Sequence, residues 1–418
     1  MSQSPVGSIN FLCLWIFFFS GTVLPAYGTA DDLLGQTGFC ENDKLCHWRF
    51  VSWRQTNALP ILANKESSPQ RYLEAREGYL ESPLFAVQPL DYYMVVFRSR
   101  TPERALWSAI FYDENGRELA GDHCSGIDLS KTWKTHEFCF KAKSGARFAC
   151  LRFQPIGPST LQIDMVSIRK VSRRAVVKWA DKIYAEMPRL TFRPPSGRWT
   201  YLKKTLNRLQ TGGALKIVML GDSIVNDIGN SPYDVLLERF YPSCRVNVIT
   251  SVRGGTGCSY FADNDHVREY VLPHNPNLVI IGGVSNQGDV ESVRRVIRQI
   301  RKGSEAEFLI LSEVVSEGFN PATERYEGSN PRTNPDWVEK IDPDGTSYRS
   351  RLFRMAREER VEFLDLSGPW GRYTLDSARP YGWFLRDAVH ANVRGSLVLA
   401  RIMEEYFSPA TRDLRTPQ

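Results

Sequence analysis

Residues 216–223 read Lys-Ile-Val-Met-Leu-Gly-Asp-Ser, and this stretch decides the fold. Its apolar run has the length of a buried strand and breaks at Gly221, with Ser223 almost directly after it. In an α/β fold, such a strand delivers side chains to the crevice at the carboxyl end of the sheet. A Ser at this point can be a nucleophile whose N–H faces a developing anion, or it can only cap the helix that follows. The stretch alone does not choose between the two.

Around this strand, strand and helix patterns alternate, which is typical of a parallel sheet with crossover helices. The expected strands are 216–220, 245–251, 278–281, 307–311 and 361–364. The expected helices are 233–240, 290–301, 348–359 and 393–407. We therefore predict an α/β fold over residues 214–410, a three-layer α/β/α flavodoxin-like sandwich.

Residues 31–171 instead show short alternating or apolar runs between turn signals, such as Asp113-Glu114-Asn115-Gly116. They predict an all-β, jelly-roll-like domain. Residues 172–213 are predicted to be a helical connector, with helices at 173–187 and 201–210 around a Pro-rich segment. Two domains agree with a length of 418 residues.

The amino end predicts export. An apolar core spans Phe11–Phe19, small residues follow up to Ala30, and no Lys or Arg precedes the core. We interpret residues 1–30 as a signal peptide, with an uncleaved anchor as the alternative. The core is short for a membrane span, so no stable membrane insertion is expected once the signal is removed. The predicted location is secreted or periplasmic.

An oxidising location favours disulfides. We predict the pairs Cys40–Cys46, Cys124–Cys139 and Cys244–Cys258, with Cys150 buried and free. The Cys and His spacings match no zinc pattern, so no metal and no cofactor are expected. A formal charge of +6 without a basic, aromatic-interleaved tract argues against nucleic acid as a partner. The sequence does not indicate an oligomeric state.

Polar residues follow several of the expected strands where each one ends, and a parallel sheet collects such positions on one edge. Ser223 follows the first strand, a Gly-rich segment at 253–257 the second, Asn286 the third, and Asp387-x-x-His390 precedes the last helix. His is the base suited to neutral pH, and a carboxylate can fix its tautomer. We expect hydrogen bonds that run in series from Ser223 to His390 and from His390 to Asp387. The N–H groups of Ser223 and Gly254 and the Asn286 amide would hold an oxyanion.

These ordered blocks, at 221–223, 254, 286 and 387–390, resemble those of the SGNH (GDSL-like) hydrolase family. The resemblance covers about 214–407. It implies metal-free esterase chemistry with Ser223 as nucleophile, His390 as base, Asp387 as orienting acid, and Gly254 and Asn286 as oxyanion donors. The third block departs from the family pattern by one extra residue, so Ser285 is an alternative to Asn286. Similarly, Gly255 or Gly257 can replace Gly254.

Several other residues admit two interpretations. His266 and His274 are competing bases or merely satisfied histidines, and Glu313 lines the pocket, pairs with Arg253, or has neither role. A second group forms either a sugar platform with a charged clamp or part of the core and rim: Trp370, Trp383 and Arg386. The long polar stretch 316–346 is expected to be a functional loop or lid.

The resulting prediction is a secreted serine esterase that hydrolyses an acyl ester, acetyl in the first instance, on a carbohydrate. The β domain loosely resembles the carbohydrate-binding jelly rolls of secreted glycan enzymes, most closely in its closing strand at 162–168. The expected partner is an acylated glycan or another small ester. Two alternatives are an O-acyltransferase that uses the same triad and an inactive glycan-binding protein.

Overall fold

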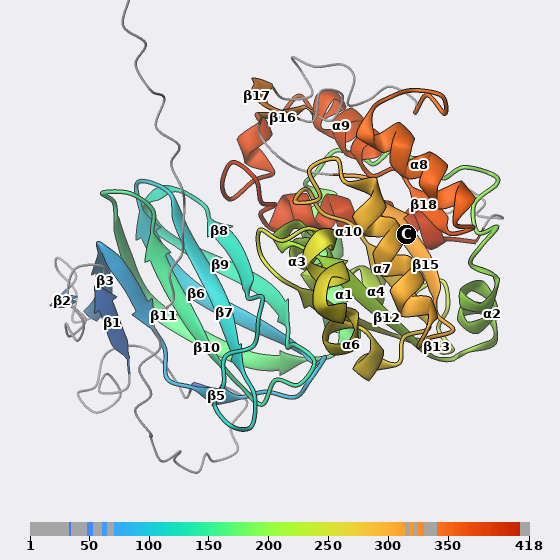
Figure 1. The fold of residues 1–418 in the computed structure, drawn as a ribbon. Helices are drawn as coiled ribbons and strands as arrows, with labels where there is room; N and C mark the ends of the chain where they lie inside the picture. The colour runs from blue at the N-terminus through green and yellow to red at the C-terminus, as the bar shows by residue number, and fades with distance from the viewer. Residues whose placement is uncertain are drawn as a thin grey trace, which may run out of the picture. The chain divides into compact units, whose positions relative to one another are not determined.

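The second half of the chain is built around a five-stranded parallel sheet (Figure 1). The structure is a computed structural model, and it describes residues 33–34, 48–52, 61–64, 71–313, 318–320, 325–329 and 341–409. The strand order is β13-β12-β14-β15-β18, so the first strand along the chain lies second in the sheet. The strands are β12 (Gly213–Gly221), β13 (Cys244–Val252), β14 (Leu278–Ile281), β15 (Glu307–Leu311) and β18 (Glu362–Leu364). All five predicted strands are confirmed, with small changes at their ends.

Helices cover both faces of this sheet, because its strands are apolar on both sides. Leu215, Ile217 and Met219 of β12 belong to one buried cluster, whereas Val218 and Leu220 belong to another. The first cluster includes side chains from α3 (Ser223–Asn230), α4 (Tyr233–Leu237), α9 (Ser367–Asp376) and α10 (Val393–Phe407). The second includes α5 (Cys258–Ala262), α6 (Val267–Tyr270), α7 (Val290–Arg301) and α8 (Tyr348–Glu358). The flavodoxin-like classification of these layers stays a prediction.

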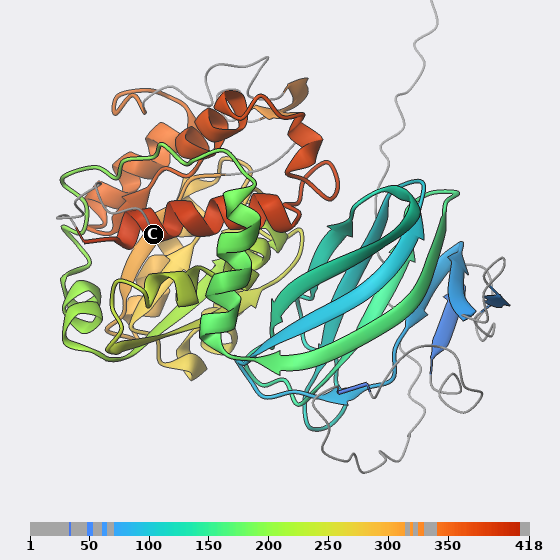
Figure 2. The same cartoon turned by 180° about the vertical axis from the view of Figure 1, so that it is seen from behind.

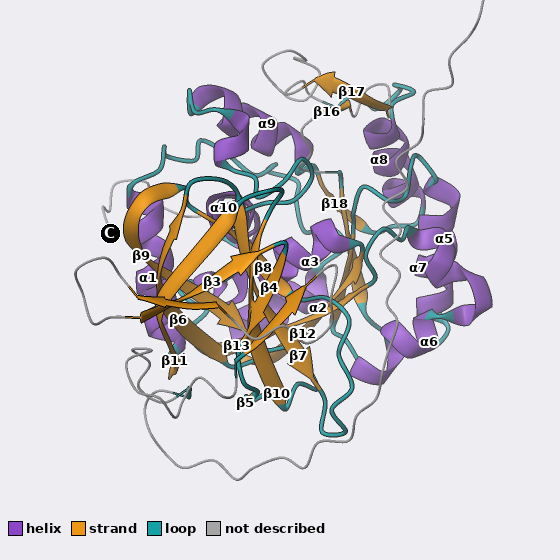
Figure 3. Ribbon diagram, turned by 90° about the vertical axis from the view of Figure 1, so that its left-hand side faces the viewer, coloured by secondary structure: helices purple, strands orange, loops and turns teal. Residues whose placement is uncertain are grey.

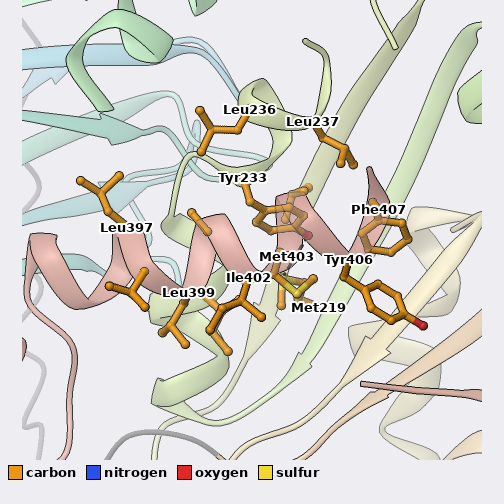
Figure 4. Close-up of a cluster of buried hydrophobic side chains, with 14 of the residues drawn as sticks. Met219, Tyr233, Leu236, Leu237, Leu397, Leu399, Ile402, Met403, Tyr406 and Phe407 are labelled. Carbon is orange, nitrogen blue, oxygen red and sulfur yellow. Dashed lines mark hydrogen bonds between the residues drawn. The ribbon is translucent and has the colours of Figure 1, made fainter. Parts of the chain in front are cut away.

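Helix α10 is the longest of these four helices on the first face. Figure 4 shows its side chains, including Ile402 and Met403, gathered beside Met219 of β12 and Tyr233 of α4. The Tyr233 hydroxyl reaches the Met219 sulfur at 3.3 Å. Because this helix follows the loop that carries His390, its packing anchors that loop to the sheet.

The first half of the chain forms two antiparallel sheets that share one core. The first has the order β1-β4-β10-β7-β8, with β5 beside β10, and the second has the order β2-β3-β11-β6-β9. The strands of the first are β1 (Arg49–Ser52), β4 (Gly78–Glu81), β5 (Phe85–Ala86), β7 (Ala105–Tyr112), β8 (His123–Ile127) and β10 (Phe148–Pro155). Those of the second are β2 (Ile61–Asn64), β3 (Arg71–Arg76), β6 (Tyr92–Thr101), β9 (Ser130–Lys141) and β11 (Thr160–Val171). The chain is thus mixed α/β with antiparallel β sheets, and jelly-roll topology stays a prediction.

Successive side chains of β6 point to opposite faces of its sheet, as in any β-strand. Tyr93, Val95 and Phe97 enter the core between the two sheets, whereas Tyr92 and Met94 pack outward beside Trp179 of α1 (Arg173–Ala185). Figure 2 shows α1 crossing α10 on the far side of the molecule from Figure 1. The second connector helix is α2 (Lys203–Thr211).

A buried charge cluster joins the sandwich to the α/β part. Asp234 of α4 accepts hydrogen bonds from the Tyr92 hydroxyl, from Lys141 Nζ at 3.5 Å and from Arg173 Nη2 at 3.4 Å. Residues from Asp32 onward form one compact unit. The proposed divisions at residues 171 and 213 stay predictions, and the segment 1–30 lies outside the described residues.

The predicted disulfides Cys124–Cys139 and Cys244–Cys258 are wrong, because all four thiols are free. Cys124 and Cys139 lie on strands of different sheets, and facing sheets stand about 10 Å apart, beyond the roughly 7 Å Cα separation that a disulfide spans. Cys244 begins β13, whereas Cys258 begins α5, beyond the other end of that strand. Cys150 is buried and free, as predicted, and the Cys40–Cys46 pair falls outside the described residues.

The described part of the chain has neither a membrane-spanning helix nor a cluster of metal ligands. None of its helices has both the length and the apolar character needed to span a bilayer. Within the same residues, no group of three or more His, Cys, Asp or Glu side chains is arranged as metal ligands. Figure 3 shows the helices in purple and the strands in orange for the residues concerned.

Candidate functional site

Ser223 is the first residue of α3, directly after the carboxyl end of β12. The turn between them requires Gly221, because a Cβ there would lie 2.5 Å from the Gly282 carbonyl oxygen and 2.6 Å from Val225 Cγ2. Asp222, not Ser223, is the N-cap: its Oδ1 accepts from the N–H of Ile224 at 2.9 Å and of Val225 at 3.4 Å. The capping interpretation of Ser223 is therefore wrong, and its hydroxyl is left for other contacts.

Asp222 also joins the first block to the third. Its Oδ2 accepts a 2.8 Å hydrogen bond from the N–H of Ser285. Gly283, at φ +107°, passes so close to this carboxylate that a Cβ would lie 2.5 Å from Oδ1. A side chain at residue 283 would push Asp222 away, so the glycine is needed to hold the blocks together. The sequence analysis missed this role, although an Asp directly before a helix is an N-cap signal.

The loop before α10 forms a tight turn around Asp387. Its Oδ1 accepts from the N–H groups of Val389 and His390, both at 2.8 Å. A bridge between Leu385 and Ala391 closes the loop, and the N–H of Arg386 donates to the His390 carbonyl at 3.0 Å. The backbone thus presents the His390 ring and the Asp387 carboxylate on the same turn.

Ser223, His390 and Asp387 form one hydrogen-bonded series. His390 Nδ1 lies 2.9 Å from both carboxylate oxygens of Asp387, and His390 Nε2 lies 2.8 Å from Ser223 Oγ. With the Nδ1 proton directed at the carboxylate, Nε2 is the acceptor for the Ser223 hydroxyl. This is the geometry that a base needs to take a proton from a serine nucleophile.

The surroundings of Asp387 keep it ionised. Partial burial acts to raise its pKa, but the hydrogen bond and charge of His390, the Val389 N–H and the charge of Arg386 together hold the pKa well below its usual value. An ionised Asp387 favours the imidazolium that forms when His390 accepts a proton.

The three expected oxyanion donors lie on segments linked to Ser223. The N–H of Arg253 bonds the Gly221 carbonyl at 3.0 Å, which seats the Gly254 loop beside the end of β12. Asn286 Oδ1 accepts from the N–H of Cys258 at 2.7 Å, so this bond orients the amide. The N–H groups of Ser223 and Gly254 and the NH₂ of Asn286 have no hydrogen bond to the described residues, which leaves them available to an anion. Their oxyanion role stays a prediction.

A buried ion pair that the sequence analysis missed connects the nucleophile helix to the base loop. Arg386 Nη1 donates to Asp227 Oδ2 of α3 at 2.8 Å and to the Ala391 carbonyl at 2.6 Å. The two side chains are only 8% and 5% exposed. Burial raises the pKa of Asp227, and the charge of Arg386 opposes that rise. Arg386 therefore links α3 to the loop of His390 inside the protein, and it is not placed to bind a sugar.

Removing Arg386 should destabilise the protein, because Asp227 would keep a buried charge without its partner. We expect Arg386→Met to lower the free energy of unfolding by about 3–5 kcal/mol in urea denaturation at neutral pH. The double variant Arg386→Met/Asp227→Asn should regain part of this loss. If the double variant is as unstable as the single one, the pair does not supply the stability attributed to it.

The sandwich contacts the same region. The Asp122 carbonyl accepts from the side-chain amides of Asn226 at 2.7 Å and Asn230 at 3.0 Å, both on α3. The Ser125 hydroxyl accepts from the N–H of Val393 at 3.0 Å, at the start of α10. Strand β8 and the loop before it therefore hold both the nucleophile helix and the helix that follows His390. No local signal marks these contacts in the sequence.

The structure separates the remaining candidates. The Ser223 hydroxyl bonds His390. His266 instead stacks on Tyr260, with the ring centres 4.1 Å apart, and His274 lies in another loop, where burial lowers its pKa. Trp370 is fully buried and donates to the Tyr381 hydroxyl, so it is core. Trp383 is half-buried under the guanidinium groups of Arg379 and Arg394, at 5.2 and 4.7 Å from its ring centre.

Two candidates remain for the loop region. Glu313 is buried after β15, whereas Arg253 is exposed and bonds the Tyr260 hydroxyl at 2.8 Å. Within the stretch 316–346, the structure describes an antiparallel pair, β16 (Gly318–Asn320) and β17 (Arg325–Ser329), and then residues from 341 onward. The lid role of that stretch stays a prediction.

Comparisons with known proteins give structural neighbours only. No family model and no curated protein matches the chain. The Bacillus subtilis protein YxiM is similar at 15% identity and a TM-score of 0.35, over 92% of this chain and 94% of that one. A two-domain esterase active on acetylated mannans, co-crystallised with mannopentaose, is similar at 18% identity and 0.38, over 50% and 53%. An acetylxylan esterase from Geobacillus stearothermophilus is similar at 17% identity and 0.35, over 47% and 95%.

Proposed function

We propose that the chain is an exported serine esterase that removes an acyl group, acetyl in the first instance, from a carbohydrate. The observation that carries this proposal is the hydrogen-bonded series from Ser223 Oγ through His390 to Asp387. Export rests on the interpretation of residues 1–30 as a signal peptide, and the carbohydrate rests on the resemblances of both halves of the sequence.

The proposed reaction has two steps. His390 Nε2 takes the Ser223 proton while Oγ attacks the ester carbonyl, and the oxyanion forms beside the N–H groups of Ser223 and Gly254 and the Asn286 amide. As the C–O bond breaks, His390 returns the proton to the departing sugar hydroxyl, which leaves an acyl-enzyme. Water, deprotonated by His390, then attacks the acyl carbon, and the bond from that carbon to Oγ breaks. The free acid leaves, and His390 returns the proton to Ser223 Oγ.

The site is accessible from solvent, which suits an ester carried on a large molecule. The Asp387 side chain is 43% exposed and that of His390 is 24% exposed. A triad near the surface can meet an acyl group that projects from a polymer without enclosing the polymer itself. On the segment between α9 and the triad loop, Trp383 is half-buried, whereas its aromatic neighbours Tyr381 and Phe384 are buried.

Truncating the proposed side-chain donor should slow the chemical step. We expect Asn286→Ala to lower kcat for an aryl acetate by about 10²–10³-fold, because one oxyanion donor is lost. Ser285→Ala is the matched control and should retain most of the activity. The reverse pattern, with the large loss in Ser285→Ala, would assign the donor to Ser285.

A direct test of the proposed function uses a fluorophosphonate probe together with acetylated oligosaccharides. We expect the probe to add to the peptide that carries Ser223, as located by mass spectrometry, and the protein to release free acetate from acetylated xylo- or manno-oligosaccharides. A chain that takes up no probe and releases no acetate would instead be a binding protein on a hydrolase-like fold. Acetate appearing on an added sugar and not in solution would indicate transfer.

A further inference from the structure

The outward face of the β2-β3-β11-β6-β9 sheet has two different halves. At one end, Tyr92 and Met94 of β6 are covered by α1. Alternation along β6 continues this face to Arg98 and Arg100, both of which reach the surface. The half of this face that α1 covers is therefore apolar, whereas the other half carries charged side chains.

An aromatic ring lies among these cations. Trp133 of β9 is half-buried, with the guanidinium carbons of Arg98 and Arg100 at 5.8 and 5.6 Å from its ring centre. The ring of Tyr72 on β3 meets it edge-on at 5.8 Å. Cations near the ring hold Trp133 in place while part of it remains exposed.

A hydrogen-bonded row keeps the side chains of this face in order. Arg100 Nε donates to Gln162 Oε1 at 2.6 Å, and Gln162 Nε2 donates to Glu74 Oε2 at 2.7 Å. Glu74 pairs with Arg76 at 2.7 Å. Arg98 is neutralised by a two-pronged contact with the buried Asp164. The row is thus preorganised, and most of its charges are paired within it.

Two cations on this face lack such a partner. Arg100 bonds a neutral amide, and Lys131 is exposed; neither has a carboxylate within ion-pair distance among the described residues. Both line a hollow of about 330 Å³ that Arg76, Pro102, Thr160 and Gln162 complete. This volume falls in the range of small-ligand sites. The hollow therefore offers unpaired positive charge beside an aromatic ring.

We propose that this face, defined by Arg100, Lys131 and Trp133, binds a carboxylated oligosaccharide such as a chain of uronic acid residues. The ligand carboxylate would accept hydrogen bonds from the free Nη groups of Arg100 and from Lys131, and a neighbouring sugar ring would pack on Trp133. The choice of a glycan over another carboxylate rests on the proposed function. The site itself does not depend on the triad.

Isothermal titration calorimetry on the full chain tests this proposal. The probe is tetragalacturonate, with xylotetraose as the uncharged comparison. We expect tetragalacturonate to bind more tightly than xylotetraose and more weakly as salt is raised. Trp133→Ala and Arg100→Ala should each weaken binding at least about tenfold, because each removes one of the two recognition elements. Arg117→Ala, at an exposed turn, is the matched control and should bind as the unchanged protein does.

The result separates this site from the esterase site. Hydrolysis of an aryl acetate by Trp133→Ala should match that of the unchanged protein, so a loss of sugar binding with intact hydrolysis supports the proposal. Equal binding of the two tetrasaccharides, or unchanged binding in both variants, overturns it. Loss of hydrolysis in Ser223→Ala with tetragalacturonate binding retained would show that the two sites are independent.

Discussion

Ser223→Ala is expected to abolish ester hydrolysis, lowering kcat for an aryl acetate by at least about 10³-fold. The change removes only Oγ, the atom that would form the acyl-enzyme. The donors of the oxyanion hole would remain, so a small residual rate above that of water is expected. Initial rates measured over a range of substrate concentrations would show the loss in kcat and little change in KM.

The control for this variant is Ser196→Ala, at an exposed position of the Pro-rich connector, which should keep full activity. The thermal midpoint of Ser223→Ala should stay close to that of the unchanged protein, because the hydroxyl contacts only His390 among the described residues. A folded Ser223→Ala protein that still turns over the ester would contradict Ser223 as the nucleophile.

Asp387→Asn should reduce kcat by about 10³–10⁴-fold near neutral pH. The substitution keeps the size of the side chain but removes the charge that would stabilise imidazolium at His390. It also presents an NH₂ group that can bond Nδ1 in the wrong tautomer, so that Nε2 carries the proton and cannot accept one from Ser223.

Asp376→Asn is the matched control for this variant. Asp376 is an exposed carboxylate on α9 that lies 3.9 Å from Arg372, so its loss should leave the rate unchanged. Because Asp387 Oδ1 also holds the turn through Val389 and His390, circular dichroism should confirm that the Asn variant is folded. A rate within a few-fold of the unchanged protein would show that Asp387 orients the loop without acting in the reaction.

Elements with a strong local signal are the ones that the sequence predicts well. The helix Val290–Arg301 is confirmed residue for residue, since Asp289 caps it and apolar residues recur at helical spacing. The strand Leu278–Ile281 is equally well defined by its apolar run. In contrast, α3 is absent from the expected helix ranges, because its eight residues include Gly and three Asn or Asp. It is stabilised by the Asp222 cap and by burial.

The candidate site divides in the same way. The ordered blocks at Ser223, Gly254, Asn286 and 387–390 are local patterns, so their convergence on one sheet edge follows from the parallel topology alone. The contacts that hold them cannot be seen locally: Asp227 and Arg386 are 159 residues apart, and Asp122 lies 104 residues before Asn226. The wrong disulfides have the same origin, since proximity in sequence says nothing about which sheet or helix places a Cys.

Local chemistry is therefore sufficient to mark the strand before Ser223 and the residue types of a serine hydrolase. Packing decides that Trp370 is core, that Arg386 is tied to Asp227, and that β8 of the sandwich supports both α3 and α10. The physical reason is that hydrophobic burial is non-directional and buried charges take whatever partner the folded chain brings within reach. Such pairings exist only once the two halves of the chain have come together.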